Sequence, residues 1–182
     1  MTHLETDRLI IRPWTLSETD RVAFHRLMSD EKIRKFYVTR KSRQEADTVL
    51  EKHVANFPES GLEWQVACLK ETAEPIGFTG LAPVHYETPF TPCVEIGWLY
   101  MPEHWGKGYA TEAARELLKH GFDHHKLEEI VAFAVHNNFP SIAVMERIGM
   151  EKVEGGEFDH PVIPEDMGHL NPHVLYRIQR ER

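Results

Sequence analysis

The chain has 182 residues, of which 41% are hydrophobic and 27% are charged, a composition typical of a globular protein with one sizeable core. The formal net charge of −8 argues against a general nucleic-acid-binding protein, which needs a basic surface to neutralise phosphates. No apolar run is long enough to span a bilayer and the N-terminus lacks a signal-peptide pattern, so we expect a cytoplasmic protein with neither membrane nor nucleic acid as a partner.

The first half of the chain carries clear signals for the starts and ends of helices. Ser17 precedes apolar residues at helical spacing, and Ser42 with Glu45 forms the S-x-x-E pattern of a capping box. Pro58 and Gly61 are expected to break the helix that starts there. Alternating apolar and polar residues then predict two strands joined as a hairpin. The elements predicted here are strands at 8–12, 62–70 and 76–81, helices at 17–29 and 42–57, and a loop over 82–93.

The second half begins with a strand, a glycine-bearing loop and a helix that follow one another without a break. Residues 94–100 are largely β-branched, aromatic and apolar, and Pro102 ends that strand because proline cannot donate to a ladder. Gly106 and Gly108 then precede alanine and leucine residues that recur at three- and four-residue steps. The elements predicted here are strands at 94–100, 129–136, 150–154 and 174–179, helices at 110–121 and 139–148, and an irregular segment over 155–172.

Together these elements predict a single α/β domain over residues 1–182. About seven strands and about four helices follow one another in mixed order, which favours one mixed, mostly antiparallel sheet flanked by helices. The two cysteines, Cys68 and Cys93, are expected to be unpaired thiols because nothing indicates an oxidising compartment. The sequence does not distinguish a monomer from a homodimer.

The loop Trp105-Gly106-Lys107-Gly108-Tyr109-Ala110 predicts an anion site. Backbone N–H groups and the positive end of the following helix would converge there, an arrangement that suits a phosphate. The segment satisfies neither the P-loop pattern G-x-x-x-x-G-K-[ST] nor the three-glycine dinucleotide pattern. It resembles instead the pyrophosphate loop of the GNAT N-acetyltransferases, [Q/R]-x-x-G-x-[G/A], in which Gly108 and Ala110 match the last two fixed positions. Trp105 stands where the wider family prefers glutamine or arginine.

The resemblance covers nearly the whole chain and extends to the subgroup similar to ribosomal-protein N-terminal acetyltransferases. It implies two splayed central strands, with the pantetheine arm of acetyl-CoA in the gap between them. It also implies an enzyme that moves an acetyl group from acetyl-CoA to a primary amine, on a protein N-terminus or a small molecule, by direct attack in a ternary complex and without a metal. The segments that carry the resemblance are Leu4–Arg12, Ile76–Leu81, Glu95–Trp98, Asn138–Met150, Phe158–Pro161 and His173–Tyr176.

The same resemblance implies which residues hold acetyl-CoA. Backbone groups of Leu99, Tyr100 and Met101 would bond the arm and polarise the thioester carbonyl, and Asn138 would reach the arm from the other side. The residues that would bind the pyrophosphate are Trp105, Gly106, Lys107, Gly108, Tyr109, Ala110 and Thr111.

Glu95 is the leading candidate for the base that deprotonates the amine. It shares a strand face with Gly97 and Leu99 among apolar neighbours, so burial should raise its pKa towards neutrality. The alternative is an ordinary carboxylate paired with an arginine or a backbone group. Ser141 would protonate the thiolate or position the substrate, although a serine in a first helical turn more often satisfies local amides. Tyr176 is expected to pack in the core rather than act as an acid.

Other polar groups are expected to be structural or solvated. His136 follows a central strand, and a structural role is favoured over that of a base. His120, His124 and His125 are expected to form an exposed helix end rather than a metal site, since the H-E-x-x-H pattern is absent. The basic stretch at 32–43 is either a solvated surface, which is favoured, or a patch that attracts an anionic ligand.

Two rival functions stay open. A non-catalytic acyl-CoA-binding or sensor domain on the same fold would be stabilised by CoA without turning over any amine. A nucleotide-binding protein would be stabilised by ATP or NAD instead.

Overall fold

The computed structural model describes residues 3–180 and places all the described strands in one eight-stranded sheet of order β1-β2-β3-β4-β5-β6-β8-β7. All neighbouring pairs are antiparallel except β5 with β6. The predicted α/β class and the mixed, mostly antiparallel sheet are therefore confirmed. The strands are β1 Leu4–Glu5, β2 Leu9–Arg12, β3 Trp64–Leu69, β4 Pro75–Pro83, β5 Val94–Tyr100, β6 Glu129–Val135, β7 Glu151–Lys152 and β8 His173–Gln179. The helices are α1 Glu18–Ser29, α2 Arg43–Ser60, α3 Tyr109–Asp123 and α4 Phe139–Arg147, with short 3₁₀ helices η1 Pro102–His104 and η2 Glu165–Leu170.

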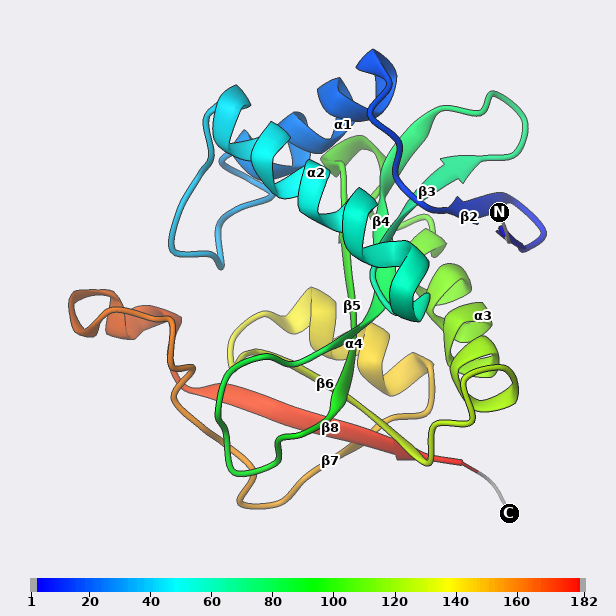
Figure 1. Ribbon diagram of the computed structural model, residues 1–182. Helices are drawn as coiled ribbons and strands as arrows, with labels where there is room; N and C mark the ends of the chain where they lie inside the picture. The colour runs from blue at the N-terminus through cyan, green and yellow to red at the C-terminus, as the bar shows by residue number, and fades with distance from the viewer. Residues whose placement is uncertain (1–2, 181–182) are drawn as a thin grey trace.

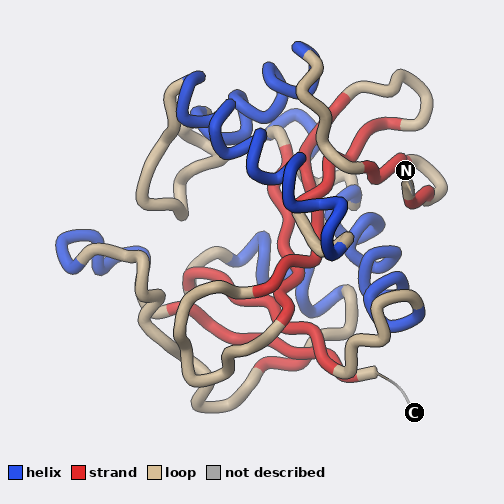
Figure 2. The backbone as a smooth tube through the Cα atoms, viewed as in Figure 1, coloured by secondary structure: helices blue, strands red, loops and turns tan. Residues whose placement is uncertain are grey.

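The helices cover both faces of the sheet (Figure 1). α3 and α4 pack on one face, where Leu117 and Ile96 belong to the same core. α1 and α2 pack on the other, where Phe24 and Leu50 form a second core that Leu99 joins. Alternate residues of β5 thus face different helix layers. The predicted irregular segment at 155–172 extends away from the sheet as a long loop that contains η2 (Figure 2).

Helix α2 follows the predicted start but not the predicted end. The capping box is present, because the Ser42 side chain accepts from the Glu45 amide and the Glu45 side chain accepts from the Ser42 amide. The helix continues through Pro58 to Ser60, since a proline in the last turn removes only one ladder bond. Gly61 then ends the helix in the left-handed region at φ +67°. No helix among residues 3–180 is long and apolar enough to cross a membrane.

Besides β7, which covers only Glu151–Lys152 of the predicted 150–154, two strands differ from the sequence prediction. β4 extends into the predicted loop as far as Pro83, whose register partner is Val94. Backbone hydrogen bonds join Val84 to Cys93 and Met101 to Ile76, so these are hydrogen-bonded pairs of the ladder, and such pairs recur at every second residue. Pro83 therefore falls between bonded pairs, and its missing N–H costs no bond to β5. The second difference is β1, which consists of two residues and is too short to show a periodic pattern.

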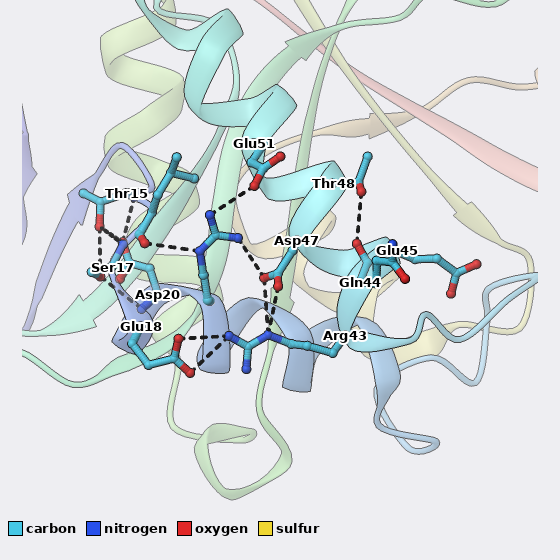
Figure 3. A network of polar contacts seen from close by, with 12 residues as sticks. Thr15, Ser17, Glu18, Asp20, Arg43, Gln44, Glu45, Asp47, Thr48 and Glu51 are labelled. Atoms are coloured by element: carbon cyan, nitrogen blue, oxygen red, sulfur yellow. Dashed lines mark hydrogen bonds and ion pairs between the residues drawn. The ribbon is translucent and has the colours of Figure 1, made fainter.

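A network of ion pairs joins α1 to α2 (Figure 3). Arg43 bonds Glu18 of α1 at 3.1 Å and Asp47 of its own helix at 3.2 Å. Arg21 of α1 reaches Asp47 and Glu51, each at 3.1 Å. Such surface pairs each contribute about 1 kcal/mol or less, so the network fixes the relative placement of the two helices more than it stabilises the chain.

β5 and β6 are parallel neighbours that pair only near their first residues. Glu95 with Val131 is the one register pair between them. α3 follows β5 and α4 follows β6, so the N-termini of both helices lie beyond the same ends of the two strands. The splayed central strands that the resemblance implies are present in this structure.

Candidate active site

A cleft of about 980 Å³ opens where β5 and β6 part. Its walls are the end of β5, the loop before α3, the first turn of α4 and residues 32–37 between α1 and α2. Ser141 lines the cleft, whereas Met101, Lys107 and Glu95 do not. The predicted cofactor residues that line it are Leu99, Tyr100, Trp105, Gly106, Gly108, Tyr109, Ala110, Thr111 and Asn138.

The loop before α3 presents unpaired amides to this cleft. Gly106 and Gly108 have φ values of +72° and +82°, which residues with a side chain rarely adopt. Gly108 is the N-cap of α3 and no side chain caps the helix, so the first-turn amides have no acceptor among the described residues. Trp105 donates through its indole N–H to the Tyr100 carbonyl at 2.7 Å and ties the loop to the end of β5. Free amides at the positive end of a helix suit a phosphate group at this end of the cleft.

Arg8 braces the loop from the N-terminal part of the chain. Its guanidinium donates to Glu112 at 2.6 Å and to the Lys107 carbonyl at 3.0 Å, and it lies 4.5 Å from the centre of the Tyr109 ring. Burial alone would raise the pKa of Glu112, but hydrogen bonds from Thr6 and Arg8 lower it below its usual value. Arg8 and Glu112 are 104 residues apart, so local sequence patterns do not reveal this contact.

The direction of the backbone groups in β5 corrects part of the prediction. The Met101 amide donates to the Ile76 carbonyl of β4 at 3.0 Å. Since hydrogen-bonded pairs recur at every second residue of the ladder, the backbone N–H and C=O groups of Leu99 also point towards β4. The backbone groups that face the gap belong to Trp98 and Tyr100. Met101 is buried in the core beneath α1 and α2, with its amide bonded to β4. Trp98 lines the cleft and replaces it.

Glu95 is a half-buried carboxylate without a partner. Within residues 3–180, no hydrogen bond or ion pair reaches its side chain, and burial raises its pKa from 4.5 to about 7. The alternative of an ordinary paired carboxylate is therefore not observed. Burial, and to a smaller degree the charge of Glu95, raise the pKa of Tyr86 above its ordinary value. A carboxylate that titrates near neutrality has the ionisation that a general base needs.

The first turn of α4 supplies Asn138 and Ser141 to the cleft. Asn138 occupies the N-cap position but makes no side-chain capping bond. The Ser141 hydroxyl has no hydrogen-bond partner in the described part of the chain, so the expected bonding to local amides is not observed. Both polar side chains are therefore available to a ligand.

His136 and Tyr176 lie outside the cleft. The His136 Nδ1 atom is 3.3 Å from the Pro172 carbonyl oxygen. Tyr176 is buried in the core, and its hydroxyl donates to Glu146 at 3.4 Å. These placements agree with the structural roles expected for the two residues.

Part of the basic stretch and one buried histidine also face the cleft. Lys32 and Lys35 line it, whereas Arg40 and Arg43 pair with glutamates at the surface. Lys32 and Lys35 are exposed, as the favoured interpretation of the stretch as solvated surface expects, and they also face the cleft. His104 lines the cleft next to the loop before α3 and is buried, with no hydrogen-bond partner for either ring nitrogen among the described residues.

Comparison with known proteins identifies the family. Residues 8–151 match the acetyltransferase (GNAT) domain. The chain belongs to the GNAT acetyltransferase family. The protein is an N-acetyltransferase, and relatives carry that activity in their names. One of them, the N-acetyltransferase YoaA of Bacillus subtilis, is 29% identical over 154 residues, which cover 82% of each chain. The nucleotide-binding alternative is thereby set aside.

Solved structures share the fold of this GNAT acetyltransferase over almost its whole length. An acetyltransferase of the GNAT family from Bacillus anthracis is 27% identical, with a TM-score of 0.76 and 98% of each chain covered. RimL, a ribosomal L7/L12 alpha-N-protein acetyltransferase solved in complex with coenzyme A, is 15% identical, with a TM-score of 0.75 and 98% of each chain covered. At that identity RimL shows the common fold alone.

Proposed function

We propose that the cleft binds acetyl-CoA and an acceptor together, and that the acetyl group moves directly to a primary amine on a protein N-terminus or a small molecule. Glu95 is the single observation that carries this proposal. It is an unpaired, half-buried carboxylate in the last register pair before β5 and β6 part, with its pKa raised to about 7. A domain that only bound CoA would have no use for such a group.

The donor end of the cleft would be bound mainly by backbone. The free amides from Gly108 to Thr111 would hold the pyrophosphate, with the helix dipole of α3 behind them. Gap-facing backbone groups of Trp98 and Tyr100 would pair with the pantetheine arm, and the Asn138 amide would reach it from α4. Since Trp105 carries no charge, backbone amides rather than a side chain at that position would stabilise the phosphates.

The acceptor end would use Glu95 as a general base. Amines are largely protonated at neutral pH, so the ammonium first has to release a proton. Because Glu95 does not line the cleft, its carboxylate would take that proton through a water. The neutral nitrogen then attacks the thioester carbonyl carbon, the C–N bond forms and the C–S bond breaks. The leaving thiolate takes a proton, for which the Ser141 hydroxyl is the candidate donor. The second proton that the attacking nitrogen loses as it becomes an amide nitrogen returns to the serine oxygen, and the products are an amide and free CoA. The acidic chain, with its net charge of −8, favours the approach of a cationic amine.

A thermal-shift screen followed by a turnover assay tests the proposal. Acetyl-CoA should raise the melting temperature, while ATP and NAD should leave it unchanged. Release of free thiol from acetyl-CoA should then appear with at least one amine among peptides with free N-termini, polyamines and aminoglycosides. Stabilisation by acetyl-CoA without thiol release from any acceptor would favour the non-catalytic CoA-binding alternative.

A further inference from the structure

We propose that His120, His124 and His125 form a binding site for a divalent transition metal ion, with zinc as the preferred occupant. The three side chains each offer a ring nitrogen, and these atoms all lie within 4.8 Å of one another. The ring of His120 lies 4.7 Å from that of His124 and 5.0 Å from that of His125, measured between centroids. These residues lie at the end of α3, as the sequence predicts, and the structure also brings their rings together.

The convergence follows from the way α3 ends. His120 and His124 are four residues apart, so they project from the same side of the helix, and their rings stack with an interplanar angle of 12°. The chain turns directly after them: the His125 amide donates to the His120 carbonyl at 3.3 Å, and Lys126 adopts a positive φ of 56°. The turn swings the His125 ring across the other two, at 83° and 88° to them.

The cluster is free to take a cation. None of the three rings makes a hydrogen bond or an ion pair with another residue in the range 3–180. His120 and His125 are half-buried and His124 is exposed, so an ion has access from solvent. The site also lies at the C-terminal end of α3, where the helix dipole favours positive charge.

Imidazole donors and their number indicate the class of metal. Imidazole suits zinc, copper and nickel, and three protein ligands leave one position of a tetrahedral zinc ion for water. Zinc–nitrogen bonds of about 2.0–2.1 Å place ligand nitrogens about 3.4 Å apart in a tetrahedron. Nitrogens within 4.8 Å reach that spacing through side-chain rotations of residues next to a turn.

The position of the site argues for a stabilising role rather than for a part in acetyl transfer. α3 has 15 residues and is therefore about 22 Å long, with the phosphate loop at its other end. The His125 ring also lies against Gly61, where an added Cβ would be 3.2 Å away, so the metal site adjoins the end of α2. A bound ion would fasten the turn after α3 next to that helix end.

Titration of the full chain without any added histidine tag tests the site. After treatment with a chelator, calorimetry with Zn²⁺ should show one ion per chain, and Co²⁺ should give the visible absorption bands of a four-coordinate ion. His124→Ala, a change at an exposed position, should lower the Zn²⁺ affinity at least tenfold. His169→Ala, a change at an exposed histidine elsewhere, is the matched control and should bind as the wild type does.

Metal binding should also raise the melting temperature of the wild type but not that of His124→Ala. The affinity for acetyl-CoA should be the same with and without Zn²⁺. Equal Zn²⁺ affinities of His124→Ala and His169→Ala, or no stoichiometric binding to the wild type, would overturn the proposal. None of these readouts depends on acetyl transfer, so a negative result for the metal site would leave the proposed function unaffected.

Discussion

Replacing Glu95 with glutamine tests the proposed base through the free energy of unfolding. The carboxyl group has a pKa of about 7 in the fold and 4.5 as its ordinary value, so between these pH values the folded chain holds a proton that the unfolded chain has released. This proton stabilises the wild type at low pH, and its contribution is lost as the pH rises through 7. At about 1.4 kcal/mol per pKa unit, the loss between pH 5.5 and 8.5 is about 2 kcal/mol, or about 1–2 kcal/mol after allowance for partial solvent access.

Urea unfolding at pH 5.5 and 8.5 measures this contribution. Because glutamine carries no titrating proton, the free energy of unfolding of Glu95→Gln should increase by about 1–2 kcal/mol relative to that of the wild type between pH 5.5 and pH 8.5. Glu128→Gln, at a carboxylate whose side chain is 86% exposed, is the matched control and should follow the wild type. If all three proteins show the same pH dependence, the Glu95 carboxyl does not have a raised pKa in the fold.

The same variant tests the role of Glu95 in turnover. The wild-type kcat/KM should rise through a limb near pH 7, whereas Glu95→Gln should lack that limb and lose about 100-fold or more near neutral pH. Above the pKa of the acceptor amine the two enzymes should converge, because the free amine is then already present. A variant that keeps the limb near pH 7 would show that another group is the base.

Three further substitutions test the loop and the fold. Gly108→Ala should weaken acetyl-CoA binding about tenfold, as measured by calorimetry, because alanine is strained at φ +82°. Gly155→Ala is the control: it introduces similar strain at φ +67° but lies away from the cleft, so its affinity for acetyl-CoA should be unchanged. Arg8→Ala removes the brace of the phosphate loop and should raise the KM for acetyl-CoA several-fold while kcat stays within about twofold, whereas a loss confined to kcat would contradict the brace. The fully buried Asp20 carboxylate accepts two 2.8 Å hydrogen bonds from Arg12, and Asp20→Ala leaves that guanidinium unpaired. The substitution should therefore lower the free energy of unfolding by about 3 kcal/mol. A loss below about 1 kcal/mol in urea unfolding would contradict this.

The sequence by itself determined the features that depend on neighbouring residues. The capping box at Ser42 appears as expected, because helix caps are decided within a few residues. The burial and raised pKa of Glu95 also follow from its apolar strand neighbours. These local signals, taken in order, were enough to indicate the fold class and the loop before α3 that presents free amides.

Only the tertiary structure decided which groups meet. Trp98 rather than Met101 faces the gap because the direction of backbone hydrogen bonds alternates along a ladder, and its phase depends on the register with β4. Arg8 braces the loop before α3 across 99 residues of sequence, and the exposed Lys35 lines the cleft from the segment between α1 and α2. The ring of His125 joins its neighbours only through the turn after α3. In each case the partners are set by packing between distant elements, which no local propensity encodes.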